Sequence, residues 1–422
     1  MTSADTVAAV LGPLSELRPW QEDLYRDLHQ HPELSHQEHR TAAVVAGPLG
    51  ETGFEVTTGV GGTGVVGVLR NGAGPTVLLR ADMDALPVRE ETGLPYASTV
   101  TATPVGEDGP VPVMHACGHD MHTACLLGAA RLLADGRRHW NGTLVVVFQP
   151  AEETIDGAQG MVDDGLAELT GPVDVALGQH VAPLPAGTLA TIPGPAFAGG
   201  TSIRTTVYGR GGHASMPQNT VDPVVLAAAI VLRLQGIVAR EVAPGEPAVV
   251  TVGRLHAGTR ANIIADRAEL LINIRYYSDA VRSTLLAAIR RIVAAECAAS
   301  GSPREPDFDI FEQAPITDND ADVTARVDTA FNAVFGSEAL STPPRVIGSE
   351  DFSDIARGVD APYTFWLFGG ADPTLFPAPG AGEATPFDVP VNHSPRFAPV
   401  IQPTLNTGTT ALVAAALAWL AA

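Results

Sequence analysis

Three histidines, an aspartate and a cysteine gather in the stretch "MHACGHDMHTA", which runs from Met114 to Ala124. Such a stretch could be a metal site, a thiol nucleophile with its base, or a polar loop. Cys117 and His119 are suitable ligands for zinc or a similar transition metal, and the thiolate favours such an ion over magnesium or calcium. A Cys117 nucleophile is the weaker interpretation, because a catalytic cysteine also needs a base and an orienting group in space.

Further polar residues interrupt the apolar strands of the first half of the chain. Asp82 and Asp84 end "PTVLLR", Glu152 and Glu153 follow "LVVVFQP", and His180 ends "DVALGQ". Open α/β sheets place their ligands at the carboxyl ends of strands. We therefore expect these side chains to converge with the cysteine and histidine of the first stretch.

Each of these residues also has an ordinary structural interpretation. Asp82 and Asp84 could cap turns, His180 could be a hydrogen-bonded structural histidine, and adjacent glutamates usually lie on a solvated face. Glu152 and Glu153, however, follow a strand that is apolar enough to be buried on both faces. Two carboxylates there would repel each other unless a cation separates them, and a divalent metal ion meets that demand. The glutamate that is not a ligand could then take a proton from metal-bound water.

Other histidines are weaker candidates. For the four in "LHQHPELSHQEH" a polar surface with local hydrogen bonds is favoured over metal binding; they are His29, His31, His36 and His39. His115 and His122 flank the metal-ligand candidates and are expected to support them.

Composition narrows the class of protein. The 422 residues carry a formal net charge of −22, which disfavours nucleic acid and anionic membranes as partners. All 25 basic residues are arginine, so chemistry that needs a lysine amine is excluded. Three scattered cysteines and the lack of a signal-like start or a long apolar run predict a cytoplasmic protein.

The order of elements predicts an α/β fold with a mixed central sheet and a second domain inserted into it. "GVVGVLR" and "PTVLLRADMD" are interpreted as two strands joined by a turn at Asn71 and Gly72. From about residue 198 the pattern becomes strand, helix, two strands, helix, strand, with Asp222 as a helix N-cap. We predict a catalytic domain of residues 1–197 and 310–422, and an α+β insertion of residues 198–309.

Several motifs occur in a familiar order: "LLRADMDALPV", "MHACGHDMHTA", "FQPAEE", "GQHV", "GRGGHASMPQNTVDPV", "GTRANIIAD", "GSEDFS" and "NHSPRF". The chain resembles the dinuclear-metal aminoacylase and carboxypeptidase-like amidohydrolases, in the branch with hippurate hydrolases and auxin-conjugate hydrolases. The resemblance implies a zinc-exopeptidase-like catalytic domain that binds two divalent ions, with zinc expected and manganese, cobalt or nickel as alternatives. The metal ligands implied by the resemblance are Cys117, His119, Glu153, His180 and His393.

The resemblance also implies roles for other residues. Glu152 matches the general base, and Asp84 matches an aspartate that supports the metal site. The insertion matches a ferredoxin-like lid and dimerisation domain, in which His213 would stabilise the oxyanion. Asn262 and Arg275 would hold the carbonyl and free carboxylate of the substrate.

The expected activity is hydrolysis of the amide bond of a small-molecule N-acyl amino acid by a homodimer. A dipeptidase or an N-carbamoyl amino acid amidase on the same scaffold, and a non-catalytic metal-binding protein, are the alternatives. Two departures from the pattern leave points open. Asp82 stands where other branches have a histidine ligand, and the 99–113 segment is longer than expected beside the acyl pocket.

Overall fold

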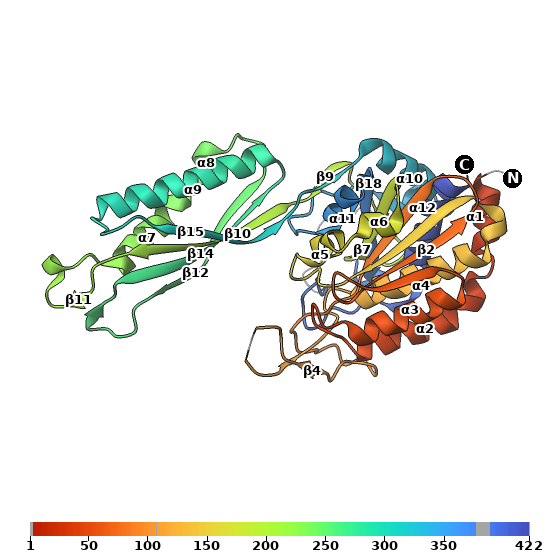
Figure 1. Cartoon of the computed structure of the whole chain (residues 1–422), viewed down its shortest axis with the longest axis horizontal. Helices are drawn as coiled ribbons and strands as arrows, with labels where there is room; N and C mark the ends of the chain where they lie inside the picture. The colour runs from red at the N-terminus through yellow and green to blue at the C-terminus, as the bar shows by residue number, and fades with distance from the viewer. Residues whose placement is uncertain (1–2, 107, 377–388, 422) are drawn as a thin grey trace. The chain divides into compact units, whose positions relative to one another are not determined.

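The computed structural model describes residues 3–106, 108–376 and 389–421, and the chain divides into two units. The larger comprises Met1–Ala196, Asp318–Pro344 and Asp351–Ala422, and the smaller Phe197–Thr317 and Arg345–Glu350. Figure 1 shows the helices and strands of each unit. No helix of the described residues is long and apolar enough to cross a membrane.

An eight-stranded mixed sheet forms the centre of the larger unit, in the order β1-β2-β6-β3-β7-β18-β8-β17. Four central strands are parallel, namely β6 (Gly142–Gln149), β3 (Thr76–Asp82), β7 (Val175–Pro185) and β18 (Tyr363–Ala371). Antiparallel strands extend the sheet on one side, namely β2 (Gly64–Asn71) and β1 (Glu55–Val60). The short strands β8 (Leu189–Ala190) and β17 (Leu340–Ser341) extend it on the other.

One predicted connection was wrong. The strands before and after Asn71 and Gly72 exist as β2 and β3, but they do not form a hairpin, because β6 lies between them and pairs with both. The apolar run of β6 is buried almost throughout. An interior position buries both faces of β6, whereas direct pairing of β2 with β3 would leave β6 more exposed. Burial of this apolar run therefore favours the observed strand order.

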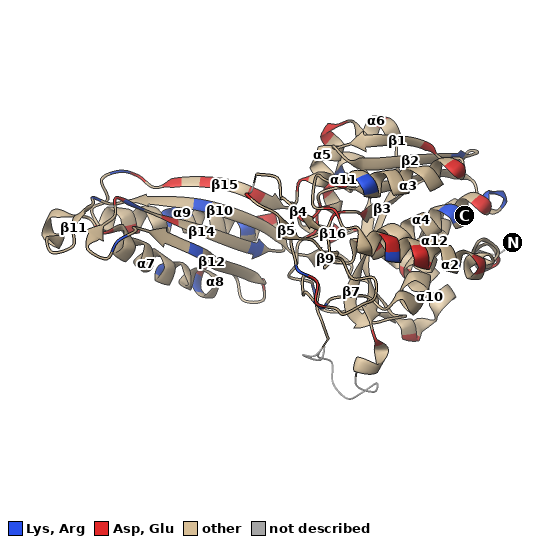
Figure 2. Ribbon diagram, turned by 90° about the horizontal axis from the view of Figure 1, so that it is seen from below, with Lys and Arg blue, Asp and Glu red and all other residues tan. Residues whose placement is uncertain are grey.

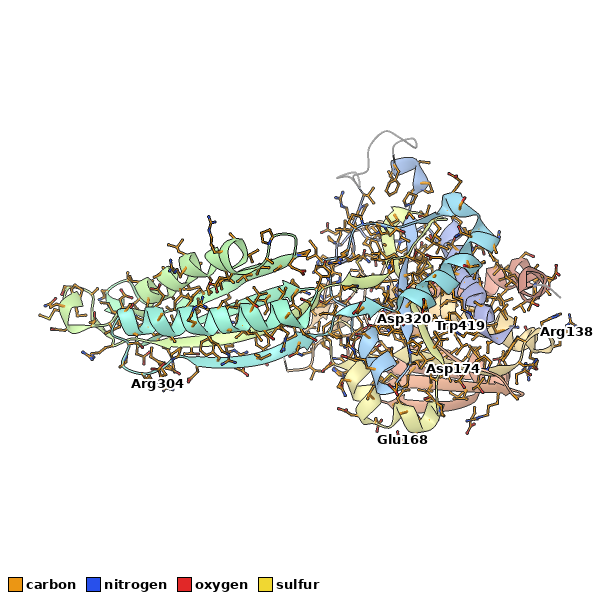
Figure 3. The ribbon with its side chains drawn as sticks, turned by 90° about the horizontal axis from the view of Figure 1, so that it is seen from above. Arg138, Glu168, Asp174, Arg304, Asp320 and Trp419 are labelled. Carbon is orange, nitrogen blue, oxygen red and sulfur yellow. The ribbon has the colours of Figure 1, made fainter. Side chains whose placement is uncertain are left out.

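Helices bury the apolar faces of this sheet. Helix α4 (His119–Asp135) packs against β3 and α12 (Ile401–Leu420), and both helices are buried along most of their length. Figure 1 shows α2 (Leu14–Gln30) and α3 (His39–Glu51) beside α4, where they cover it. Helix α10 (Ala321–Phe335) packs on α12, and Arg326 lies over the ring of Trp419, which is labelled in Figure 3. Helices α5 (Gly157–Asp163) and α11 (Phe352–Gly358) pack against each other beside the central strands.

The smaller unit has a four-stranded antiparallel sheet in the order β12-β14-β10-β15. Its elements follow one another as β10 (Gly199–Tyr208), α7 (Pro223–Leu234), β12 (Ala248–Ala257), β14 (Arg267–Tyr276), α9 (Asp279–Ala299) and β15 (Asp307–Ala314). This strand order and connection are those of a ferredoxin-like fold. The predicted N-cap is confirmed, because the Asp222 side chain accepts a hydrogen bond from the Val224 N–H.

The predicted end of the insertion at residue 309 falls inside β15. That strand pairs with β10 from Asp307 to Ala314, so it belongs to the smaller unit, whose segment ends at Thr317. Figure 2 shows acidic residues along β15, an edge strand of this sheet. Charge on an edge strand opposes pairing with another chain.

Candidate metal centre

Three parallel strands bring the candidate residues together at one edge of the sheet. β3 pairs with β6 so that Asp82 lies opposite Gln149, and the turn that carries Glu152 and Glu153 follows directly. β7 pairs with the other side of β3 and carries His180. The convergence expected from the strand ends is therefore what the structure has.

His119 begins α4, and Asp84 fixes its orientation. The His119 Nδ1–H donates to Asp84 Oδ1 at 3.1 Å, so Nε2 is the ring nitrogen left to bind a metal ion once it gives up its proton. Nε2 is buried and has no hydrogen-bond partner among the residues that the structure describes. Around it lie carboxylate oxygens of Asp82 at 3.6 Å, Glu152 at 3.8 Å and Glu153 at 3.9 Å.

His180 is oriented in the same manner. Its Nδ1–H donates to the carbonyl oxygen of Val181 at 2.7 Å, and its Nε2 lies 3.4 Å from Cys117 Sγ. Burial lowers the pKa of His180 well below its usual value, so the imidazole is neutral, as a metal ligand must be.

His393 completes a second group of donors. Its Nε2 lies 3.5 Å from Glu153 Oε2, and Cys117, Glu153 and His393 each offer a ligand atom within 4.8 Å of the others. The His393 backbone adopts a φ of 70°, and its N–H donates to the carbonyl oxygen of Ala116. Asn392 donates to the carbonyl oxygens of Cys117 and Val181, which ties this loop to the other ligand loops.

These donors fit divalent metal ions. Ligands at about 2.0–2.3 Å from a tetrahedral ion lie about 3.3–3.8 Å from one another, close to the separations above. Cys117 lies beside both His180 and Glu153, so its thiolate is placed to be shared between two ions. The unpartnered Nε2 of His119 has the geometry of a ligand that faces a cation. The structure thus brings together all five predicted ligands.

The pKa values of the candidate ligands also favour a cation site. Burial raises the pKa of Glu153 to about 7 and that of the Cys117 thiol well above its usual value. Burial opposes protonation of His119, but Asp82 and Asp84 outweigh it and raise its pKa to about 10. In the metal-free protein these candidate ligands therefore tend to carry protons, which a bound cation would displace.

Asp82 and His122 also lie near His119 and His180, within the same possible metal group. Both oxygens of Asp82 are engaged, one by Arg80 at 2.7 Å and the other by the His122 Nδ1–H at 2.5 Å. His122 Nε2 in turn accepts the Val181 N–H at 2.7 Å. His122 therefore links the Asp82 carboxylate to the Val181 peptide beside His180. This assigns a contact to Asp82 that the sequence left open.

Arg80 is fully buried, and its hydrogen bonds hold this edge of the sheet together. It donates to Gln149, Asp82 and Asp351, and Asp351 also accepts the side-chain amide of Gln149. A buried arginine is stable only when acceptors surround it. Burial raises the pKa of Asp82, but His119 and Arg80 outweigh it and hold that pKa well below its usual value.

The prediction of a polar surface was wrong for His29. His29 is fully buried, and its two ring nitrogens donate to Asp120 at 2.6 Å and Glu90 at 3.1 Å. Burial disfavours its charge, yet the two carboxylates raise its pKa to about 10. Ser35 donates to Asp84 at 2.7 Å. His29 and Ser35 of this segment therefore support the loops that carry the candidate metal ligands.

The other flanking histidines differ among themselves. His31 and His36 are exposed, as predicted for a polar surface, and His36 pairs with Asp156. His115 is buried, and burial lowers its pKa to about 4, which keeps it neutral. Neither of its ring nitrogens has a hydrogen-bond partner in the described part of the chain.

Three predicted site residues belong to the smaller unit. His213 lies in β11 (Gly212–His213), which pairs with β13 (Ile263–Ile264), and the Ala214 N–H donates to the carbonyl oxygen of Asn262. His213 and Asn262 are thus neighbours at one pair of loops. Arg275 lies in β14 and donates to Asn273 at 3.0 Å and to the Ser349 hydroxyl.

Comparison with known proteins adds independent information. A model of the peptidase family M20/M25/M40 matches residues 78–381. Thermostable carboxypeptidase 2 of Saccharolobus solfataricus is 38% identical over 368 residues, which cover 86% of this chain and 89% of that protein. The IAA-amino acid hydrolase ILR1-like 2 of Arabidopsis thaliana is 34% identical over 85% of this chain and 79% of its own length. The YXEP protein of Bacillus subtilis, a dinuclear metal binding peptidase, superposes with a TM-score of 0.76 at 28% identity, covering 96% of this chain and 98% of that one. These matches confirm the predicted fold class and resemblance.

Proposed function

The chain belongs to the peptidase family M20/M25/M40 and is a hydrolase of that family, and from this premise we propose that it hydrolyses the amide bond of N-acyl amino acids. The observation that carries the proposal is the buried Nε2 of His119, which has no hydrogen-bond partner within the described part of the chain and faces three carboxylates beside the Cys117–His180 pair. Such a site is built for cations and for water activated by them.

The ligand residues that we propose are Cys117, His119, Glu153, His180 and His393. We propose two divalent ions per subunit, with zinc first because of the thiolate and imidazole donors, and manganese, cobalt or nickel as alternatives. When bound, such ions would polarise a carbonyl group and lower the pKa of a bound water molecule toward neutral pH.

The remaining steps belong to the side chains of this chain. Glu152 is nearly buried and lies beside His119, so it is placed to take the proton of the attacking water and return it to the leaving amine. Asp84 holds His119 by its Nδ1–H and Glu153 by its backbone N–H. His213 is proposed to stabilise the oxyanion, Asn262 to hold the carbonyl, and Arg275 to bind the free carboxylate.

The relatives support a substrate with an amide next to an amino acid. The Arabidopsis relative is named for hydrolysis of an acyl–amino acid conjugate and the Saccharolobus relative is named a carboxypeptidase. Both names describe cleavage of an amide whose leaving group is an amino acid. A carboxypeptidase or dipeptidase activity is therefore the second candidate. We further propose a cytoplasmic homodimer associated through the smaller unit, which would act as the lid.

The test is an assay against a panel of N-acyl amino acids, dipeptides and N-carbamoyl amino acids. Each is run with the protein as isolated, after chelation, and after zinc, manganese or cobalt is restored. The proposal predicts hydrolysis of N-acyl amino acids that is lost on chelation and regained with metal. Faster release from dipeptides would favour the second candidate. Activity that survives chelation and is lost on thiol alkylation would overturn the metal mechanism.

A further inference from the structure

Glu38 lies outside the predicted site and is completely buried. One carboxylate oxygen accepts the N–H of His36 at 3.0 Å and the N–H of Ala151 at 2.9 Å, and the other accepts the Thr63 hydroxyl. The contact with Ala151 joins residues that are 113 positions apart in the chain. It ends on the turn that carries Glu152 and Glu153.

We propose that Glu38 is a positioning residue that fixes this turn, and with it the direction in which Glu152 approaches the site. The inference rests on the proposed function, in which Glu152 is the general base.

The turn needs an external support because of its backbone conformation. Ala151 has a φ of 52°, a left-handed conformation that L-residues with a side chain rarely adopt. Its carbonyl oxygen accepts the N–H of Gly157, and a Cβ on Gly157 would come within 1.7 Å of the Pro150 oxygen. The turn therefore folds tightly over Gly157, and the Glu38 carboxylate holds the N–H that this conformation exposes.

Two buried carboxylates hold the turn at its two ends. Glu38 accepts the N–H of Ala151, and Asp84 accepts the N–H of Glu153 at 2.9 Å. Glu152 lies between these two fixed peptides. A ligand such as Glu153 is also held by its metal, whereas a general base depends on the protein for its placement. Loss of the Glu38 contact is thus expected to disturb Glu152 more than it disturbs metal binding.

The test separates reach from charge with three variants of Glu38. Glu38→Ala removes the acceptor. Glu38→Asp keeps the charge but withdraws the carboxylate by about 1.5 Å, one carbon–carbon bond. Glu38→Gln keeps the reach and one acceptor oxygen, and the Thr63 hydroxyl can turn to accept from the new amide.

Glu33 provides a matched control five positions away. Its carboxylate also accepts three hydrogen bonds, from the N–H of Arg40 and from the N–H and hydroxyl of Thr41. These contacts support the start of α3, so Glu33→Ala is expected to cost stability without changing the turn.

The readouts are kcat and KM for an N-acyl amino acid, bound metal per subunit, and the visible absorption spectrum of the cobalt-loaded protein. We expect Glu38→Ala and Glu38→Asp to lose about 10- to 100-fold in kcat, with KM within about twofold and metal content unchanged. Glu38→Gln and Glu33→Ala should stay within about threefold of the original kcat. If Glu38→Ala does not fold, Glu38→Asp carries the comparison.

Three results would overturn the inference: unchanged kcat in Glu38→Asp, a larger loss in Glu38→Gln than in Glu38→Asp, or an equal loss in Glu33→Ala. Failure of the proposed function is distinguishable, because the original protein would then bind metal without cleaving any panel substrate. In that case the cobalt spectrum decides. A shift in Glu38→Asp with none in Glu38→Gln or Glu33→Ala supports the inference, and the absence of any shift rejects it.

Discussion

Asp84→Asn tests the metal centre most directly, because Asp84 connects its two sides. The carboxylate accepts from the His119 Nδ1–H, the Glu153 N–H and the Ser35 hydroxyl. Asparagine has the same shape, but one of its two terminal atoms is a donor. If the amide nitrogen faces His119, the histidine must carry its proton on Nε2 and can no longer bind metal through it. If the amide nitrogen faces the Glu153 N–H instead, two donors meet and that hydrogen bond is lost.

The expected size of the effect follows from these contacts. A hydrogen bond to a charged group contributes about 1.5–3 kcal/mol, and either orientation of asparagine loses at least one. That range corresponds to about 10- to 100-fold in an equilibrium constant, the effect usual for residues that orient metal ligands. We therefore expect Asp84→Asn to weaken metal binding by about 10- to 100-fold.

Competition with a chromophoric chelator measures this affinity, and elemental analysis gives the metal content per subunit. Ser35→Ala is the matched control, because it removes one donor from Asp84 and leaves the carboxylate to hold both ligands. Its loss of metal affinity should be clearly smaller than that of Asp84→Asn, because Ser35 contacts neither His119 nor the Glu153 N–H and its removal leaves both of those hydrogen bonds in place. Asp84→Asn with the original affinity and metal content would refute the orientation of His119 and Glu153 by Asp84.

Three further predictions concern the base, the protons on the ligands and the substrate carboxylate. Glu152→Gln should lower kcat by about 10²- to 10⁴-fold with metal content unchanged, and loss of metal would contradict its role as base rather than ligand. Metal affinity, measured by the same competition from pH 5 to pH 9, should fall more steeply below pH 7, because burial raises the pKa of Glu153 to about 7 and that of the Cys117 thiol well above its usual value. Each ligand proton that the metal displaces changes the metal affinity by about tenfold per pH unit. Glu153→Gln should therefore remove the extra slope of affinity against pH below pH 7. Arg275→Lys should raise KM by about 10- to 100-fold for a substrate with a free carboxylate and much less for the matching amide, and equal losses for both would count against a carboxylate clamp.

Much of the candidate metal site could be predicted, because each strand end that contributes to it is visible in the local sequence. A buried apolar strand that ends in carboxylates is visible in the sequence at Asp82, at Asp84 and beyond Gln149. The parallel pairing of β3, β6 and β7 then brings those ends to one edge. The proposed ligand set rests on the resemblance, since the spacing of dispersed ligands carries little information.

The parts that could not be predicted depend on long-range pairing. The placement of β6 between β2 and β3 depends on which strand gains most from burial, and a turn signal at Asn71 and Gly72 does not report that. Histidine and glutamate in a polar segment are expected to be exposed to solvent. His29 and Glu38 are nevertheless buried, because they have hydrogen-bond partners in distant segments. A sequence does not show such partners.

The charges of the centre give one further argument for bound cations. Asp82, Asp84, Glu152 and the half-buried Glu153 meet around His119, and the Cys117 thiol lies beside them. Arg80 pairs with Asp82, which leaves the other carboxylates to share the protons of the histidines or to take up protons themselves. Burial, together with the neighbouring Asp84 and Asp82 carboxylates, raises the pKa of Glu153, so this group takes up a proton most readily. Divalent cations would remove the repulsion without protons, so the metal-free fold carries an electrostatic cost that metal binding relieves. Added metal should therefore raise the melting temperature of the original protein, and it should raise that of Glu153→Gln less, because this variant has lost both the charge and the ligand.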